Sequence, residues 1–286
     1  MANKALQTGE LVNGPSLYST LIADVEFSKQ ASHIQERLIS SPQLEFTETL
    51  TLDAHLVYWY ENLPSYFRSP NPCPDWLVQP RASSKWRYQN LRIILHRPAI
   101  MEAALRHLEF QDLCQEQRVC VNKCQTLARS SIEMIASEWT PNQYSGWPAS
   151  WYLFQACIIP LLSLYTFKEY SLQAEDWNLQ VQKAIHLFKE LEPWDNTARR
   201  QHELISLLYN AHNNNLKLTT SHSTTAPLMK APSAAESLYS EQLLQNRNWS
   251  EMPLWGSLFN FEDLDVNFLE PGSNVNGWNL DLQGFD

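Results

Sequence analysis

The chain has 286 residues, of which 44% are hydrophobic and 18% charged, and its net charge is −10. This apolar content is enough for a sizeable core and excludes disorder over the whole chain. Nucleic-acid binding needs clustered cations, so a chain this acidic is not expected to bind DNA by itself. Only 7 residues are glycine, and the glycine-rich loops that hold phosphates in nucleotide-binding folds are missing from the sequence. Scarce glycine and long runs with helical periodicity predict an all-α fold.

Helical periodicity divides most of the chain into predicted helices. Apolar residues that recur every three or four positions predict helices over these ranges: 16–39, 52–63, 85–97, 99–113, 117–138, 149–170, 177–191 and a last one that Asn196 or Thr197 can cap. The breaks follow proline, which lacks a backbone N–H and disrupts the interior of a helix. Loops are therefore expected over 69–82 and 141–148, and a helix end near Pro98.

The most apolar segment is Trp151–Tyr165, which is 15 residues long. A membrane-spanning helix needs about 20 mostly apolar residues, so we expect this segment to be a buried core helix, kinked at Pro160. The N-terminal sequence has no apolar stretch typical of a secretory signal, and the odd number of cysteines favours reduced thiols inside the cell.

The composition changes after the last predicted helix. Residues 213–235 are rich in Asn, Thr, Ser, Ala and Pro, which is typical of a flexible linker. Residues 248–286 contain seven acidic residues and no Lys or Arg. The expected organisation is as follows: a lead-in over 1–15, a helical domain over 16–215, the linker over 216–239 and an acidic-aromatic segment over 240–286.

Three segments carry motifs that occur together, in this order, in one known family. LDAHLVYWYENLP (52–64) looks like that family's L-x-x-W-x-x-x-LP helix, KWRYQNLRIILHRPAI (85–100) like its signature helix ending in L-x-RP, and GWPASWYLFQACIIPLLSLY (146–165) like its W-x-x-x-Y-x-x-F-x-A helix. Roughly residues 15–215 thereby resemble the fungal-specific transcription factor domain, the middle homology region of binuclear zinc-cluster regulators. The second segment looks closest to the galactose-activator subgroup.

The resemblance implies an all-helical regulatory domain with a role in transcription control in the nucleus. The positions that match the family's signature, with a structural or regulatory role, are Trp86, Leu91, Arg92, His96, Arg97 and Pro98.

Regulators of this family also carry six cysteines near the N-terminus, which ligate two zinc ions beside a basic stretch. This chain has 5 cysteines, and Cys114, Cys120 and Cys124 lack the C-x-x-C start of such a cluster. The zinc would belong to that missing cluster, so we expect no cofactor in this chain and no direct DNA binding. The chain looks like the rear half of such a regulator, or like a variant that has lost its DNA reader.

Four basic side chains gather on one predicted helix: Arg87, Arg92, His96 and Arg97. One interpretation is an anion or ligand site between helices. The other is that Arg97 fastens a helix end or binds a buried carboxylate near Pro98, a common use of the arginine fork.

Signals of catalysis and of metal binding are missing from the sequence. No histidine lies three or four residues from another, and no nucleophile motif or paired-carboxylate arrangement can be located. We therefore do not expect an enzyme. An all-α enzyme is kept only as a third hypothesis, after the transcription-regulator and sensor hypotheses given below. The three clustered cysteines are expected to be helix-packing and surface thiols. Four tryptophans are expected in the core, or else around a small-molecule pocket: Trp139, Trp147, Trp151 and Trp177.

The acidic-aromatic segment has the pattern of a disordered activation segment, because acidic residues alternate with large apolar ones. Repulsion between acids such as Glu262, Asp263 and Asp265 keeps the aromatic rings in solvent until a partner offers a groove with a basic rim. The residues expected to bind coactivators are Trp255, Leu258, Phe259, Phe261, Leu264 and Phe268. The alternative is that this segment docks on the helical domain and covers an apolar groove.

Together these observations predict the regulatory and activating part of a fungal zinc-cluster transcription factor. Its tail would bind coactivator or mediator-type proteins, and its helical domain could receive a regulatory protein or a small-molecule effector. A membrane partner is not expected. The competing hypothesis is a metabolite-sensing or inhibitory partner module.

Overall fold

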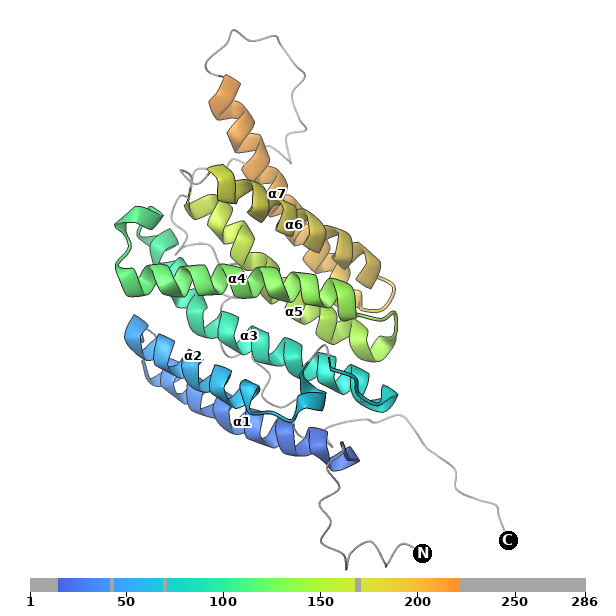
Figure 1. Cartoon of the computed structure of the whole chain (residues 1–286). Helices are drawn as coiled ribbons and strands as arrows, with labels where there is room; N and C mark the ends of the chain where they lie inside the picture. Colours follow the sequence, from blue (N-terminus) through green and yellow to red (C-terminus); the bar gives the residue numbers. More distant parts are fainter. Residues whose placement is uncertain (1–14, 42–43, 69–70, 168–170, 222–286) are drawn as a thin grey trace, which may run out of the picture. The chain divides into compact units, whose positions relative to one another are not determined.

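The computed structural model describes residues 15–41, 44–68, 71–167 and 171–221, which form α-helices, two short 3₁₀ helices and connecting loops (Figure 1). The elements in chain order are α1 (Leu17–Ser40), α2 (Phe46–Glu61), η2 (Ser65–Phe67), α3 (Asp75–Leu105), η3 (Phe110–Asp112), α4 (Gln115–Glu138), α5 (Gln143–Thr166), α6 (Ser171–Leu191) and α7 (Asn196–Ser221). The predicted all-α fold is confirmed for these residues. The chain divides into two units, Met1–Met229 and Lys230–Asp286, and every described residue belongs to the first.

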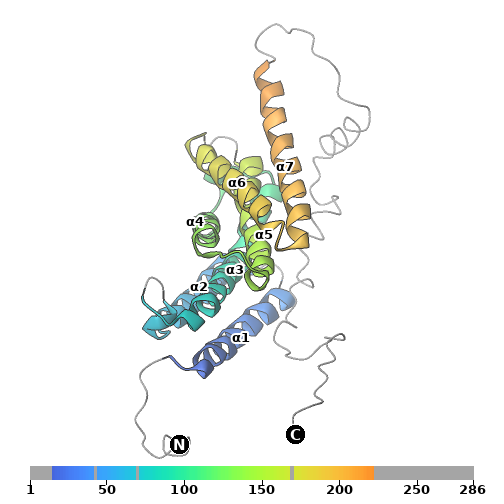
Figure 2. The ribbon, with the colours of Figure 1, turned by 90° about the vertical axis from the view of Figure 1, so that its right-hand side faces the viewer.

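The helices of the first unit lie in layers that follow the order of the chain (Figures 1 and 2). α1 and α2 lie on one side and pack on α3, while α6 and α7 lie on the other side and pack on α5. Between them, α3, α4 and α5 pack on one another and form the centre of the domain. The three segments that resemble the family's motifs lie in α2, α3 and α5.

α5 is the central apolar helix. Its stretch Tyr144–Thr166 is long and apolar enough to cross a membrane, but most of it is buried inside the domain. Burial against other helices is what a core helix of this composition needs, so the prediction of a buried core helix at Trp151–Tyr165 is confirmed. Both Pro148 and Pro160 lie inside α5.

The predicted loop over 69–82 is correct for 71–74 but wrong from Asp75 onwards, and the predicted helix end near Pro98 is wrong. α3 begins at Asp75 and continues through Pro80 and Pro98 to Leu105, so the two helices expected on either side of Pro98 are one. A proline inside a helix costs about 3 kcal/mol or more. The residues around Pro98 are buried on both sides of it, and packing of such residues supplies most helix stability in proteins.

The predicted loop over 141–148 is also wrong over most of its length, because α5 begins at Gln143. Asn142 caps this helix, since its side-chain Oδ1 accepts the backbone N–H of Ser145 at 2.9 Å. The cap explains how a segment with glycine and proline starts a helix here.

The ends of the other helices agree with the sequence to different degrees. α1 and α4 match their predicted ranges closely, whereas α2 begins at Phe46 and α6 at Ser171, each six residues earlier than expected. At α7 the cap is Asp195 and not Asn196 or Thr197: its Oδ1 accepts the Thr197 N–H at 3.1 Å and its Oδ2 the Thr197 hydroxyl at 2.5 Å. α7 continues to Ser221, beyond the expected domain end at 215.

Candidate functional site

A buried carboxylate on α2 binds cations from two other helices. Asp53 is 0% exposed, because it lies on the side of α2 whose apolar residues face the core. Arg92 of α3 makes a bidentate contact with this carboxylate: its Nε donates to Oδ1 at 2.6 Å and its Nη2 donates to Oδ2 at 3.1 Å. Lys123 of α4 donates to Oδ2 at 2.6 Å, and Nε2 of His96 lies 3.3 Å from the same oxygen. These four residues are called the Asp53 cluster below.

The electrostatics of the Asp53 cluster keep Asp53 and Arg92 charged. Burial alone would raise the pKa of Asp53, but the adjacent His96 and the hydrogen bonds from Arg92 and Lys123 outweigh it and hold that pKa well below its usual range. Burial alone would lower the pKa of Arg92, but Asp53 outweighs it and raises that pKa above its usual value. The carboxylate and the guanidinium therefore remain charged at neutral pH. Because Asp53 is buried, removing one partner would leave an uncompensated charge inside the domain, which is costly.

Aromatic rings shield one side of this cluster. Arg92 lies over the ring of Tyr88, with its Cζ 5.3 Å from the ring centroid, and its Nη1 donates to the Tyr88 hydroxyl at 3.1 Å. Tyr60 of α2 stacks on Tyr88 with centroids 4.2 Å apart. Burial raises the pKa of Tyr88 to about 12, so its phenol stays neutral and acts as a partner of Arg92 rather than as an acid or base.

A second buried arginine links α3 to α5. Arg97 is 5% exposed, and its Nη1 donates to the side-chain amide oxygen of Gln155 at 2.9 Å. Burial lowers the pKa of Arg97 to about 10, so it is still charged at neutral pH. It is thus Arg92 that binds a buried carboxylate, whereas the acceptor described for Arg97 is an amide.

Arg87, another basic side chain of α3, faces α1. Nη1 of Arg87 lies 3.1 Å from Oδ1 of Asp24, and its Cζ lies 4.9 Å from the centroid of the Phe27 ring. Arg87, Arg92 and Arg97 therefore bind three different helices. The four basic side chains that the sequence places on one helix serve separate helix junctions, and only Arg92 and His96 share an acceptor.

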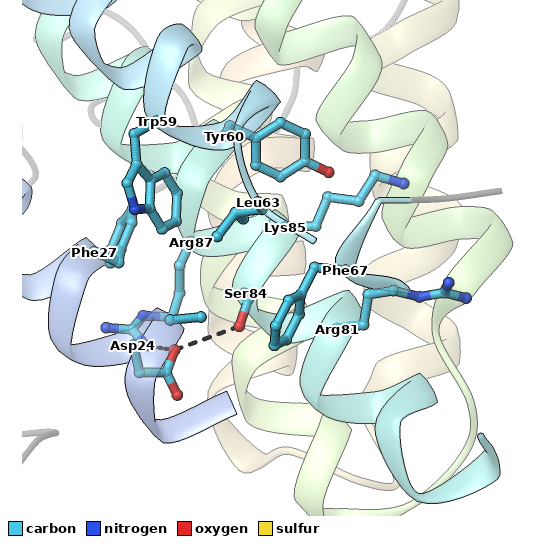
Figure 3. A pocket seen from close by; sticks show the side chains of 11 residues that line it. Asp24, Phe27, Trp59, Tyr60, Leu63, Phe67, Arg81, Ser84, Lys85 and Arg87 are labelled. Atoms are coloured by element: carbon cyan, nitrogen blue, oxygen red, sulfur yellow. Dashed lines mark hydrogen bonds and ion pairs between the residues drawn. The ribbon is translucent and has the colours of Figure 1, made fainter. Parts of the chain in front are cut away.

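A small pocket lies beside the Arg87 junction, between α1, α2, η2 and α3 (Figure 3). Phe27 and Trp59 form its apolar wall with ring centroids 5.5 Å apart, and Ser84 donates to Oδ1 of Asp24 at 3.4 Å on its polar side. The volume open to a water-sized molecule is about 10 Å³, which is room for about one water molecule. As folded, this pocket is too small for a metabolite.

The other candidate residues have mixed outcomes. Trp177 is buried as predicted, but Trp147 is 41% exposed and stacks on Trp151 with centroids 6.3 Å apart. The cysteines on α4 are helix-packing and surface thiols as predicted: Cys120 and Cys124 are buried, and Cys114 is exposed. Within the described ranges, no three His, Cys, Asp or Glu side chains come together as a metal site.

Five of the six signature residues are buried or nearly so, and the sixth, Pro98, is half-buried inside α3. Trp86 and His96 are at most 2% exposed. Such burial gives these residues a structural role in α3. The residues expected to bind coactivators lie outside the described part of the chain: Trp255, Leu258, Phe259, Phe261, Leu264 and Phe268.

Sequence reasoning did not identify the partners of the arginines. Asp53, Lys123 and Gln155 were not singled out. A usable signal existed for Asp53, because it directly follows Leu52 and precedes Leu56 by three positions, on the apolar face of the helix. An acid on such a face needs a cation from another element.

Comparisons of this chain with protein-family models, with curated proteins and with solved structures found no match. Any assignment of function therefore depends on the residues of the chain itself.

Proposed function

We propose that this chain is the regulatory and activating part of a fungal zinc-cluster transcription factor. The observation that carries the proposal is that the three family-like segments bind one another through polar residues within them. Asp53 of segment 52–64 binds Arg92 of segment 85–100, and Arg97 of the second segment binds Gln155 of segment 146–165. These contacts support the proposal because a shared regulatory domain requires the three segments to pack together.

These contacts suit a regulatory scaffold. Each buried polar group requires its partner at one distance and one angle, so it fixes how α2, α4 and α5 sit on α3. Asp53 is 0% exposed, and both of its carboxylate oxygens accept from cations of neighbouring helices. The Asp53 cluster therefore joins α2, α3 and α4, and this supports a role of the domain as a scaffold for other parts of the protein.

The activating role is assigned to the acidic-aromatic segment. Its acids keep Trp255, Phe259 and Phe261 from collapsing onto one another, and a coactivator groove with a basic rim would bind both kinds of side chain. Ordering the segment on binding costs about 2–5 kcal/mol of the gross interaction energy. Recruitment is therefore of modest affinity and reversible, as a regulated activator requires.

A reporter assay in yeast tests this proposal. Residues 1–286, 1–247 and 240–286 are each fused to an unrelated DNA-binding domain, and activation is expected from 240–286 but not from 1–247. A weaker signal from 1–286 than from 240–286 would mean that the helical domain masks the tail. If no fusion activates, the activator assignment fails, and the inhibitory-partner hypothesis takes its place.

A pair of substitutions assigns the activity to the tail's central aromatic residues. Replacing Phe259 and Phe261 together by Ala in the 240–286 fusion is expected to remove most of the reporter signal, because the partner's groove loses its apolar contacts. Phe285→Ala is the matched control, since it removes the same type of ring outside the expected binding set. Equal loss from both would contradict the assignment of recruitment to this set. Immunoblots confirm equal expression.

A further inference from the structure

α1 is apolar on two opposite faces, although the domain covers only one of them. The inner face is buried against α3 and its neighbours and consists of Ala23, Phe27, Ile34 and Leu38. The outer face carries large apolar side chains that are 46–73% exposed: Tyr18, Leu21, Ile22, Val25 and Ile39. We call these five residues the outer stripe. Figure 2 shows α1 at the edge of the domain.

The spacing of the outer stripe is that of a helix-pairing seam. Tyr18, Leu21, Val25 and Ile39 occupy positions of one heptad series, in which steps of three and four residues alternate. The remaining positions of the series, between Val25 and Ile39, are polar: Ser28, Ser32 and Gln35. Packing inside the domain explains the apolar residues on the inner face of α1, but not those of the outer stripe. The series therefore fits a second helix lying along α1, with its apolar contacts mainly in the N-terminal half.

We propose that the outer stripe pairs with α1 of a second copy of the chain, with the two helices parallel about a two-fold axis. In that arrangement each seam residue meets its own counterpart, so one stripe supplies both sides of the interface. Apolar residues then face apolar residues, and the polar positions in the middle face each other, which fixes the register of the two helices. This proposal does not depend on the function proposed above.

The charges beside the seam favour the parallel arrangement. Lys29 lies on one flank of the heptad series and Asp24 on the other, five residues apart, which in a parallel pair places Lys29 across from Asp24 of the second copy. The side chain of Asp24 is 32% exposed while bound to Arg87, so it remains within reach of a second cation. An antiparallel pair with full overlap would instead place Lys29 against Lys29, which is repulsive.

Sedimentation equilibrium of the full chain tests the proposal. The interface is small, so association is expected in the micromolar range. The measured mass should rise from 33.2 kDa towards twice that value between about 1 and 100 μM. Substituting Leu21→Glu together with Val25→Glu is expected to weaken association at least tenfold, because two carboxylates then enter each side of the seam. Circular dichroism shows whether the variant keeps its helices.

Matched controls come from α6 and α7. Leu179 and Leu207 are 61% and 57% exposed, and Leu179→Glu and Leu207→Glu are expected to leave association unchanged. The proposal is overturned if the unmodified chain stays monomeric over the whole range. It is also overturned if the controls weaken association as much as the α1 variant does.

A cysteine cross-link tests the parallel orientation separately, in a chain whose accessible thiols are removed by Cys73→Ser and Cys114→Ser. A two-fold parallel seam brings position 25 close to its counterpart, so Val25→Cys should form an intermolecular disulfide on mild oxidation. Leu179→Cys in the same background should not. Association without cross-linking at position 25 would overturn the parallel arrangement.

Discussion

Two arginines five residues apart on α3 have opposite surroundings. Arg92 binds the carboxylate of Asp53 on α2, and that acid raises its pKa against the effect of burial. Arg97 binds the amide of Gln155 on α5, and burial lowers its pKa to about 10. The first junction is held by compensated charge. At the second, the acceptor described for the guanidinium is a neutral amide, on a helix that is mostly buried.

The neighbouring helices explain why a single polar contact is expected to matter less at the second junction. α5 is buried along most of its length, and burial of apolar side chains contributes roughly 25 cal/mol for each Å² removed from water. α2 has a narrower buried face, formed by Thr49, Leu52, Asp53 and Leu56. Loss of a polar contact should therefore cost more at the α2 junction than at the α5 junction, and the predictions below test this difference.

The largest effect is expected from Asp53→Asn, which keeps the shape of the side chain but removes its charge. Arg92 and Lys123 would then face each other without a carboxylate, and breaking a buried pair of this kind costs about 3–5 kcal/mol. For a domain of this size the melting temperature should fall by about 10 °C. Urea unfolding of the full chain measures the loss.

Asp176→Asn is the control for that substitution. Asp176 pairs with Arg129 on the surface, where the two side chains are 38% and 48% exposed. A pair this exposed contributes less than about 1 kcal/mol. If both variants lost the same stability, the Asp53 cluster would be no more than another surface pair.

The pH dependence of stability is expected to report the Asp53 charge. The pKa of Asp53 lies well below its usual range in the folded chain, whereas in the unfolded chain it is about 3.9. Its contribution is therefore fully present above about pH 5 and is lost as the pH falls through 4 towards the folded-state pKa. The stability gap between the unmodified chain and Asp53→Asn should stay wide between pH 7 and 5 and narrow below 4.

Unfolding curves at pH 7, 5 and 3 measure this gap. His96 also faces Asp53, so both proteins are compared again with His96→Gln, which removes the titration of the imidazole. A gap that is equally wide at pH 3 and at pH 7 would show that the carboxylate's charge does not stabilise the junction.

The overall fold could be predicted from the sequence where the signal is local. α1, α4 and α6 follow from apolar residues at helical spacing, and this periodicity persists after folding. The breaks at proline could not be predicted in the same way. Pro98 is a poor helix residue in isolation, but α3 continues through it because buried neighbours on both sides hold the helix together.

The site could be predicted only in part, for a different reason. Arg92 and Arg97 were named from the sequence, but an arginine does not reveal which helix it will face. Its partners depend on how distant helices pack: Asp53 lies 39 residues from Arg92, and Gln155 lies 58 residues from Arg97. Lys123 completes the first junction from 70 residues away from Asp53. Pairings of this kind are set by the tertiary structure.

The smallest effect is expected at the second junction. Gln155→Leu removes the amide that accepts from Arg97 and should cost about 1.5–3 kcal/mol, the usual contribution of one hydrogen bond to a charged group. Gln173→Leu makes the same change at an exposed position of α6 and is expected to alter stability by no more than about 0.5 kcal/mol. Urea unfolding compares both variants with Asp53→Asn.

Gln155→Glu then converts the second junction into a copy of the first, because it places a carboxylate where the amide accepts from Arg97. If charge compensation is what separates the two junctions, Gln155→Glu should be more stable than Gln155→Leu at pH 7. This advantage should shrink below about pH 4, where the glutamate gains a proton. A Gln155→Glu variant no more stable than Gln155→Leu would mean that packing alone governs the α3–α5 contact, since a favourable partner for the buried guanidinium would then have no measurable value.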